Sequence, residues 1–576
     1  MLNYDLAQIF YEIADFLDIE GVAWKPQAYR KAARTIENLQ EDVEEIYNEK
    51  GIKGLLEIEG IGQALAEKIE EYIHTGELKD YSKLKKSLPK GISELLEIGG
   101  LGPKKVAILY QKLKIKNIKE LEFAIKKNKV AEMPGFGQKT QENILAGIQL
   151  HKHGTERMLL GEALPIARQL VSELKKLKEA QQIEIAGSLR RKKETIGDID
   201  ILISSKNPVK VMDKFTSLSY VKRILAKGPT KSSVYLSSDI QVDLRVIDPK
   251  VFGAALQYFT GSKEHNIKLR GIAQNNGYKL SEYGLFNKKT GKLVAGKTEE
   301  EIYKKLGRQY IEPELRENYN EIELAKDKKL PKLVELKDIK GDFHMHTIAS
   351  DGANTAEEMA LAAKKFGYEY IAITDHTKYD RIANGLNEKE MLEHAKRIRD
   401  LNKKIKGIKI FAGAEVAILA DGSLDFPEDV LKKLDIVVAS LHSGFKQDKD
   451  AATKRVLKAL DNKYVDIFGH PTGRIIHQRE PIKFNMPEVL KLCKERKVLL
   501  EINSSPSRLD LKDTDIKQAI DIGCKFVIDT DSHAASHFYG LEYGVATARR
   551  GWATPDHIVN TKPLNQLHRY FRKLKL

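Results

Sequence analysis

The chain has 576 residues, of which 41% are hydrophobic and 31% charged, and this balance predicts a soluble globular protein of several domains. It carries neither an apolar run of about 18 residues nor a basic-apolar leader, so we expect a cytoplasmic protein and exclude membrane and secreted classes. Two cysteines and a net charge of +15 fit a reducing compartment, argue against thiolate metal sites and suit a polyanionic partner.

The first 150 residues have apolar residues at helical spacing, and one pattern occurs in them three times. An apolar stretch, a Gly-apolar-Gly turn and a helix follow one another in LLEIEGIGQALAEKI (55–69), LLEIGGLGPKKVAIL (95–109) and VAEMPGFGQKTQENIL (130–145). Glycine permits a tight turn, and the N–H groups that open the next helix can bind a phosphate. The pattern resembles the helix-hairpin-helix motif, which implies binding of the DNA backbone without reading of sequence. A single copy is also compatible with a plain helix corner, whereas three copies favour DNA binding. The residues concerned are Gly60, Gly62, Gly100, Gly102, Lys104, Gly135 and Gly137.

The segment IEIAGSLRRKKETIGDIDILI (183–203) reads as strand, basic loop and strand. Asp198 and Asp200 lie two apart on the second strand and therefore share one face. Asp243 lies in another apolar strand, IQVDLRVI. Three carboxylates that converge from neighbouring strands repel one another unless cations lie among them, and such oxygen ligands suit Mg²⁺.

These motifs resemble the nucleotidyltransferase core of the X family of DNA polymerases. The resemblance rests on GS, R and GDID, on the distant aspartate, and on YFTGS at 258–262. WKPQAYRKAARTI (24–36) resembles the lyase domain of DNA polymerase beta, and the likeness covers about residues 1–330. It implies that Asp198, Asp200 and Asp243 bind two Mg²⁺ ions and that Asp243 helps activate a primer hydroxyl. It further implies nucleotide contacts at Arg157, Gly187, Ser188, Arg191, Gly197, Tyr258, Phe259, Gly261 and Asn266, and a template contact at Arg270.

Two lysines bear on the resemblance. Lys263 follows TGS where the animal enzyme has an acid, so we expect it to attract a nucleotide before DNA arrives. Lys68 occupies the position of the lyase amine that forms a Schiff base, with Lys25 and Tyr29 as its neighbours. Ala64 stands where the family has a further lysine, which leaves an ordinary solvated Lys68 as the alternative.

Beyond residue 318 a polar linker is predicted, and short apolar strands then alternate with helical stretches, a pattern typical of a parallel sheet. Seven strands are predicted: DFHMH, YIAITDH, IFAGAEV, IVVASLH, VDIFGH, VLLEIN and FVIDTDSH. Six of them carry an acid or a histidine near the carboxyl end, where a β/α barrel places its chemistry. Single histidines usually have a packing role, but histidines at nearly every strand end indicate a metal site.

This region resembles the PHP (polymerase and histidinol phosphatase) domain, a distorted barrel with a trinuclear metal site. The resemblance implies nine ligands, which are His344, His346, Asp351, His376, Glu415, His442, His470, Asp531 and His533. Asp375 is expected to orient a ligand, and Arg474 either meets a phosphate or is a surface charge. Imidazole and carboxylate ligands without cysteine suit Mn²⁺, Zn²⁺ or Fe²⁺, and clustered metals suit phosphoester hydrolysis.

The sequence thus predicts a multidomain protein with a helical amino-terminal region, an α+β nucleotidyltransferase core and a distorted β/α barrel. The expected divisions are 1–85 (lyase-like), 86–150 (fingers-like), 151–255 (palm), 256–317 (thumb-like), 318–338 (linker) and 339–576 (PHP). We expect a monomeric, nucleoid-associated repair polymerase that fills gaps in gapped or nicked DNA with dNTPs. Its PHP domain is expected to act as a 3′-5′ exonuclease, with abasic endonuclease or 3′-phosphatase action also open. The rival readings make that domain a small-molecule phosphatase or a structural brace.

Overall fold

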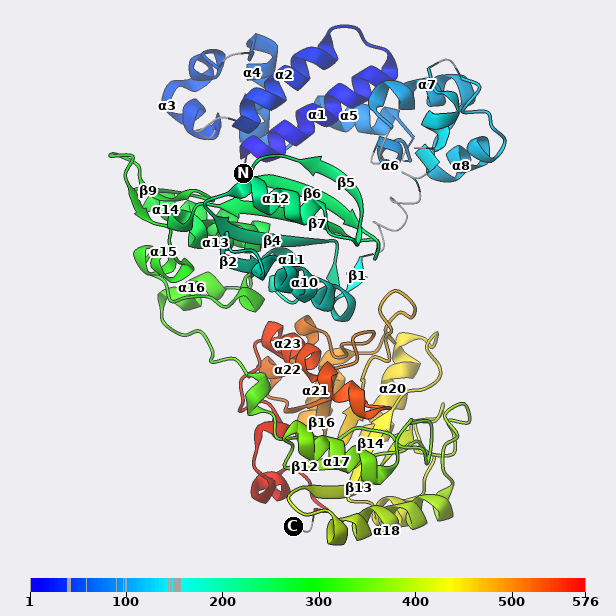
Figure 1. Ribbon diagram of the computed structural model, residues 1–576. Helices are drawn as coiled ribbons and strands as arrows, with labels where there is room; N and C mark the ends of the chain where they lie inside the picture. The colour runs from blue at the N-terminus through cyan, green and yellow to red at the C-terminus, as the bar shows by residue number, and fades with distance from the viewer. Residues whose placement is uncertain are drawn as a thin grey trace. The chain divides into compact units, whose positions relative to one another are not determined.

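The computed structural model in Figure 1 divides into two compact units, Met1–Glu156 and Arg157–Leu576. The residues that the structure describes are 2–38, 43–58, 60–89, 91–96, 98, 101–133, 135–142, 144–145, 148 and 157–574. Among them no helix is both long and apolar enough to cross a membrane.

The described part of the first unit is helical, as the sequence predicts. One core joins α1 to α2, α3 and α4 through side chains such as Phe10, Ala33 and Ile69. A second core gathers around α7 and α8 and includes Leu109 and Leu121. The helices are α1 (Leu2–Glu20), α2 (Lys25–Asn38), α3 (Val43–Leu56), α4 (Gln63–Thr75), α5 (Lys79–Ser87), α6 (Ile92–Leu96), α7 (Pro103–Leu113) and α8 (Ile118–Lys126).

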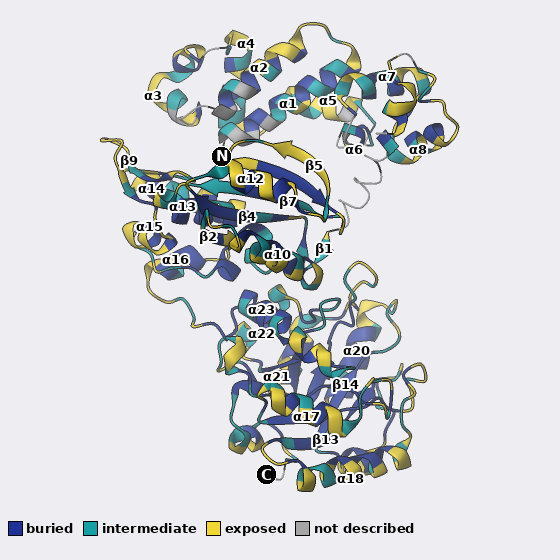
Figure 2. Cartoon of the chain, in the orientation of Figure 1, coloured by how far each residue is buried: buried dark blue, intermediate teal, exposed yellow. Residues whose placement is uncertain are grey.

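The second unit begins with a five-stranded sheet of order β2-β4-β7-β6-β5, in which β4 and β7 run parallel. Ile199, Ile201 and Val242 face a core shared with α10 and α12, whereas Leu202 of β4 packs toward α13 on the other face. The exposed edge strand β5 is the most solvated strand of this sheet (Figure 2). The elements are β1 (Met158–Leu159), α10 (Leu160–Lys175), β2 (Ala180–Ile185), α11 (Gly187–Arg190), β3 (Thr195–Ile196), β4 (Asp198–Ser205), α12 (Pro208–Thr216), β5 (Val221–Lys227), β6 (Lys231–Leu236) and β7 (Gln241–Ile247).

A smaller layer follows the sheet and continues into the segment predicted as a linker. Within residues 318–338, helix α16 buries Ile322 and Ala325 in the same core as Leu269 and Tyr303. This segment is therefore anchored, because its apolar side chains complete the preceding core although nearly half of its residues are charged. The elements are α13 (Phe252–Thr260), α14 (Lys263–Asn275), β8 (Tyr278–Ser281), β9 (Gly284–Asn287), β10 (Leu293–Ala295), α15 (Glu299–Lys305) and α16 (Glu321–Lys326).

The remainder is a barrel of seven parallel strands in sequential order, β11 to β17. Closure is nearly complete, because Met345, just after β11, forms a parallel bridge with Ser532, just after β17, and the His346 N–H donates to the Ser532 carbonyl at 2.8 Å. Helices cover the outside, with buried apolar residues packed against the strands and exposed residues on their outer faces (Figure 2). The strands are β11 (Gly341–Asp342), β12 (Tyr370–Ile373), β13 (Lys409–Ala417), β14 (Ile436–Ser440), β15 (Ile467–Gly469), β16 (Leu499–Asn503) and β17 (Phe526–Asp529). The helices are α17 (Ala356–Phe366), α18 (Glu388–Lys404), α19 (Glu428–Leu431), α20 (Lys449–Leu460), α21 (Met486–Arg496), α22 (Asp513–Ile522) and α23 (Leu541–Arg550).

The barrel interior changes character along its axis. Phe411 of β13 and Leu499 of β16 belong to an inner apolar cluster that the carboxy-terminal residues Phe571 and Leu574 close at one end. Glu415 and Glu501 lie further along the same two strands, an even number of residues beyond Phe411 and Leu499. Because side chains alternate along a strand, the residues that continue the apolar lining toward the carboxyl ends are acids.

Candidate active sites

Three carboxylates lie on one face of the palm sheet. Strand β4 pairs with β7 in parallel, so that Asp200 stands opposite Asp243, and Asp198 is two residues before Asp200. The intervening residues Ile199 and Val242 are buried on the opposite face. Strand alternation therefore produces the convergence that the sequence predicts.

The electrostatics of this face favour a bound cation. Burial, followed by repulsion from Asp198 and Asp243, raises the pKa of Asp200 to about 7. Burial and Asp243 also raise the pKa of Asp198. Burial would raise the pKa of Asp243 as well, but hydrogen bonds from Gln241, Lys231 and Ser233 lower it overall. Carboxylates held this close, with only one compensated by its neighbours, form a donor set that fits divalent ions.

The loop before the carboxylates approaches them through two glycines. Gly187 has φ +62°, and a Cβ there would lie 2.3 Å from Oδ2 of Asp200. A Cβ at Gly197 would lie 2.9 Å from the Arg157 guanidinium, which is held by the Thr195 carbonyl (2.7 Å). Ser188 is half-buried in α11. The structure thus gathers the predicted triphosphate residues Gly187, Ser188, Gly197 and Arg157 on the loop and strand edge beside the carboxylates.

The helices after the sheet bring the YFTGS motif to the same loop. Arg191 donates to the Thr260 carbonyl, and its guanidinium lies 3.2 Å from a Cβ built on Gly261. The Phe259 ring lies under Arg245 of β7, 4.4 Å from ring centroid to guanidinium carbon, and Tyr258 packs edge-on against it.

Three further predicted contact residues lie on α14. Lys263 opens the helix and is exposed, and Arg270 is half-buried near its other end. The Asn266 amide donates to the Tyr258 carbonyl at 2.7 Å and accepts from Gln257 at 2.8 Å. Asn266 would have to give up a hydrogen bond in order to reach a base.

The hairpin turns share one hydrogen bond. The N–H of the residue between the glycines donates to the carbonyl three residues earlier in the chain. The pairs are Ile61 to Ile58 (3.0 Å), Leu101 to Ile98 (3.0 Å) and Phe136 to Met133 (3.1 Å). Ile61, Leu101 and Phe136 are all buried. Gly60, Gly135 and Gly137 have positive φ, and Gly62 and Gly102 precede α4 and α7 as caps, with exposed Lys104 in the first turn of α7. Gly100 lies outside the described residues.

The candidate lyase residue is paired. The Lys68 ammonium contacts Asp80 and reaches the Tyr29 hydroxyl, and Tyr29 packs edge-on against Phe10. Burial would lower the pKa of Lys68, but Asp80 and Tyr29 outweigh it and raise the pKa above its usual range. Lys25, at the start of α2, adds positive charge near Asp80. A Schiff base needs the free amine, so Asp80 opposes that chemistry.

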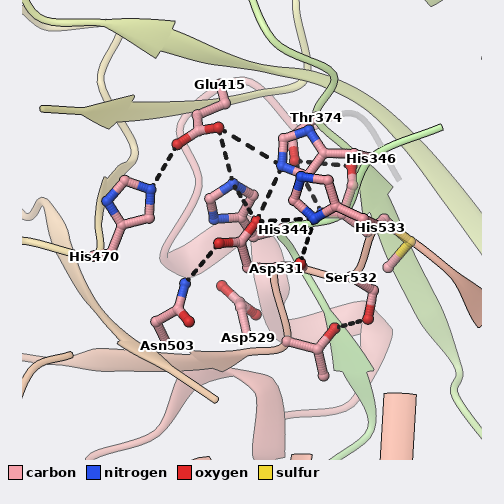
Figure 3. A network of polar contacts seen from close by, with 12 residues as sticks. His344, His346, Thr374, Glu415, His470, Asn503, Asp529, Asp531, Ser532 and His533 are labelled. Carbon is pink, nitrogen blue, oxygen red and sulfur yellow. Dashed lines mark hydrogen bonds and ion pairs between the residues drawn. The ribbon is translucent and has the colours of Figure 1, made fainter. Parts of the chain in front are cut away.

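All nine predicted PHP ligands meet at the carboxyl end of the barrel. Three overlapping groups have candidate donor atoms within 4.8 Å of one another. They are His346, Asp351, His376 and His533; His344, His346 and Asp531; and His376, Glu415 and His442. Figure 3 shows Glu415 with one oxygen facing His470 and the other facing His344 and His346, at 2.9, 3.5 and 3.6 Å.

The donor atoms of this ring fit metal ions. Nε2 of His344, both ring nitrogens of His346 and Oε2 of Glu415 are buried without a hydrogen-bond partner. Burial and the neighbouring His376 lower the pKa of His346 to about 4 and so keep it neutral. Burial opposes ionisation of Glu415, but the surrounding histidines hold its pKa well below the usual range. Neutral imidazole and ionised carboxylate are the forms that bind metals.

A second layer of acids orients the histidines, and only Asp375 was expected from the sequence. Asp375 accepts from His394 at 2.8 Å and from the Thr347 N–H at 2.7 Å, so it holds the His346 loop. Glu501 lies 2.6 Å from Nδ1 of His344, and Asp380 lies 3.1 Å from Nδ1 of His442. Sequence reasoning missed both acids, although Glu501 stands in the one predicted strand that lacked a ligand.

Arg474 has neither of the two roles expected for it. It is buried and donates to the carbonyls of Arg508 and Leu509 and, at 2.7 Å, to Glu194 of the palm loop. It is thus an internal tie between two parts of the second unit.

Comparison with known families agrees with this architecture. Residues 157–248 match the DNA polymerase beta palm, 255–317 the DNA polymerase beta thumb, and 342–505 the PHP domain. Residues 1–78 match a helix-hairpin-helix domain, and 92–149 match the SAM-like helix-hairpin-helix tandem. Fold and sites therefore define a polymerase-beta-like core joined to a PHP domain.

One relative matches the whole chain. It is the DNA polymerase/3′-5′ exonuclease PolX of Bacillus subtilis (strain 168), 37% identical over 576 residues, with both chains covered completely. A probable phosphatase of Thermoanaerobacter sp. (strain X514) is 33% identical over 246 residues, which cover 41% of this chain and 95% of that protein. The chain belongs to the PolX family of DNA polymerases.

Proposed function

We propose that the chain extends primers in short gaps of duplex DNA and shortens 3′ ends at its PHP domain. The observation that carries the proposal is the presence of two chemically different donor sets, three carboxylates on β4 and β7 and, at the barrel end, three overlapping ligand groups together with His470 beside Glu415. The full-length PolX relative, named for both activities, supports the same pairing.

At the polymerase site, Asp198, Asp200 and Asp243 would hold two Mg²⁺ ions, which lower the pKa of a hydroxyl and neutralise a triphosphate. Arg157, Arg191 and the backbone of Gly187 and Ser188 would bind the triphosphate oxygens. Tyr258, Phe259 and Gly261 would line the sugar, with Lys263 and Asn266 toward the phosphates and the base. The hairpin turns, with Lys104, and Arg270 of α14 would grip DNA.

At the PHP site, three overlapping ligand groups support about three ions of Mn²⁺, Zn²⁺ or Fe²⁺, which acidify water and stabilise charge on a phosphate. Glu415, central to the ring, would bridge two of them. Glu501 hydrogen-bonds to Nδ1 of His344, and Asp380 lies 3.1 Å from Nδ1 of His442, so each acid would leave Nε2 of its imidazole for a metal ion.

The test uses a 5′-labelled primer before a one-nucleotide gap, incubated with Mn²⁺ with and without dNTPs. We expect extension by one nucleotide with dNTPs and stepwise shortening without them. A protein that does neither would contradict the proposal.

A second candidate concerns the PHP domain alone. The relatives that match it at 33% identity are named probable phosphatases, which favours hydrolysis of a phosphomonoester. The two candidate functions are separated by comparing the rate of hydrolysis of a free phosphomonoester with that of a DNA 3′ end at equal concentration. Faster release of phosphate from the free ester would make the domain a small-molecule phosphatase.

A further inference from the structure

The polymerase part and the barrel of the second unit share a contact surface, which we call the seam. Leu509 and Tyr543 of the barrel are buried in the same core as Leu160 and Leu189 of the palm. At Gly161 a Cβ would lie 2.4 Å from Pro506, so the two backbones approach closely there. The seam is therefore a packed interface whose apolar contacts hold the two parts in register.

Arg550, the last residue of α23, makes contacts on both sides of the seam. It is buried, and its guanidinium lies 2.6 Å from Asp513 of α22 on its own side. Across the seam, Nη1 of Arg550 lies 3.0 Å from Glu317 and donates to the main-chain carbonyl of Arg191 at 2.8 Å. A planar guanidinium can satisfy three acceptors at once, which a lysine ammonium in the same place cannot do with equal geometry.

One acceptor across the seam, the Arg191 carbonyl, belongs to the loop that we assign to the triphosphate, and the other, Glu317, contacts the side chain of Arg191. Glu317 accepts from Nε of Arg191 at 3.1 Å. Arg550 therefore contacts Arg191 in two ways, directly at the Arg191 carbonyl and indirectly through Glu317, which binds the Arg191 guanidinium. Arg191 in turn donates to Thr260, beside Gly261. One chain of contacts thus runs from the barrel through the loop to the YFTGS motif.

The same loop is held at a second point. Arg474 of the barrel lies 2.7 Å from Glu194, three residues beyond Arg191. Both ends of the basic loop are therefore fixed by arginines of the barrel. A loop that must present Arg191 to a triphosphate gains preorganisation from such fixed partners.

We infer that Arg550 is a positioning residue for nucleotide binding, through which the PHP domain sets the placement of Arg191. The inference rests on the proposed function of the polymerase site. Removing Arg550 takes away one of the cations that share Glu317, leaves Arg191 (3.1 Å) and the more distant Lys193 (3.7 Å) as its partners, and frees the Arg191 carbonyl. We expect the KM for dNTP to rise by roughly 3- to 30-fold, with a smaller change in kcat.

The experiment compares Arg550→Gln with wild type in single-nucleotide gap filling, with dNTP titrated. Arg168→Gln is the matched control, because Arg168 of α10 makes a bidentate pair with Glu542 of α23 across the same seam but does not touch the loop. We expect the KM to rise in Arg550→Gln and to remain unchanged in Arg168→Gln, while primer shortening without dNTPs is unchanged in both.

Glu317→Gln supplies an independent variant should Arg550→Gln fail to fold. It should also raise the KM, and Arg550→Lys should restore affinity in part. An unchanged KM in folded Arg550→Gln or Glu317→Gln overturns the inference, and so does an equal rise in Arg168→Gln, which would mean general loosening of the seam. A wild type that cannot extend the primer at all would instead refute the proposed function.

Discussion

The palm carboxylates and the barrel-end ring both collect acidic oxygens for divalent ions, but they require very different amounts of the fold. Asp198, Asp200 and Asp243 come from two adjacent parallel strands, and strand alternation alone places them together. The barrel ring requires ligands from six strand ends and the closure of seven strands. The palm site is therefore locally encoded, whereas the PHP site exists only when the whole barrel has formed.

The two sites also differ in how their charges are compensated. Only Asp243 in the palm has strong partners, and Asp200, with a pKa raised to about 7, depends on a cation to stay ionised near neutral pH. In the barrel, histidines and carboxylates compensate one another, so that the pKa of Glu415 falls well below its usual range. We therefore expect the palm to take up its ions together with a nucleotide, and the barrel to retain its ions.

The largest expected effect separates the two sites by substitution. Asp243→Ala should reduce primer extension by roughly 10³-fold or more, because several kilocalories of charge stabilisation are lost, and should leave shortening intact. His344→Ala should do the reverse, measured on the labelled gapped primer. If His344→Ala still shortens the primer at the wild-type rate, the ring has another substrate and the phosphatase candidate gains.

Removing the metal ions should show that the barrel site binds its ions more tightly than the palm site does. Ions at about 100 times their Kd stabilise a folded domain by roughly 2.7 kcal/mol, so adding Mn²⁺ to chelator-treated protein should raise the Tm of the barrel. Glu415→Gln should remove most of this rise, because Glu415 faces five histidines, whereas Asp243→Ala should preserve it. An equal loss in both variants would contradict a resident barrel site.

Substitution of Glu501 tests whether the acids that contact the ring histidines are needed for metal binding and primer shortening. Glu501→Gln should lower shortening by about 10- to 100-fold and raise the Mn²⁺ concentration needed, because His344 loses the partner that fixes its tautomer. Asp466→Asn is the control, since Asp466 is a buried acid paired with Lys573 and not with a ring histidine. A Glu501→Gln protein with wild-type metal dependence would show that barrel packing alone orients His344.

The sequence was informative where chemistry repeats at short spacing. It predicted the helical first unit, the seven strands and the residues that the structure gathers at each site. Glu501 was missed because it lies inside an apolar strand and meets His344 across 157 residues. The contact of Arg474 with Glu194 was missed because the two residues are 280 positions apart. Within 318–338, Glu321 pairs with buried His265, a contact that charge composition cannot reveal. The alternation of side chains along a strand predicts which residues can be ligands. The residues that orient those ligands come from distant parts of the chain and are revealed only by the tertiary fold.

Lys68 extends the comparison to a possible third site in the first unit. Lys68→Ala should abolish any borohydride-trapped adduct with abasic DNA. Asp80→Ala should increase trapping by a few-fold near pH 7.5, because the raised pKa of Lys68 then falls and more free amine is present. The gain should diminish as pH rises toward the pKa of Lys68. Trapping that survives in Lys68→Ala would assign the amine to another residue.

Lys263 offers the smallest effect, and it tests whether the palm attracts a nucleotide before DNA. Lys263→Ala should weaken dNTP binding without DNA by about 3- to 10-fold, the loss of roughly 1 kcal/mol expected for an exposed charge. Lys268→Ala is the control, since Lys268 lies on the same helix α14 but outside the segment that follows YFTGS directly. Isothermal titration with Mg²⁺ and dNTP measures both. Equal affinity in Lys263→Ala and wild type would mean that nucleotide binding without DNA depends only on the loop arginines and the metal ions. The charge of Lys263 would then not be needed to attract a nucleotide to the palm.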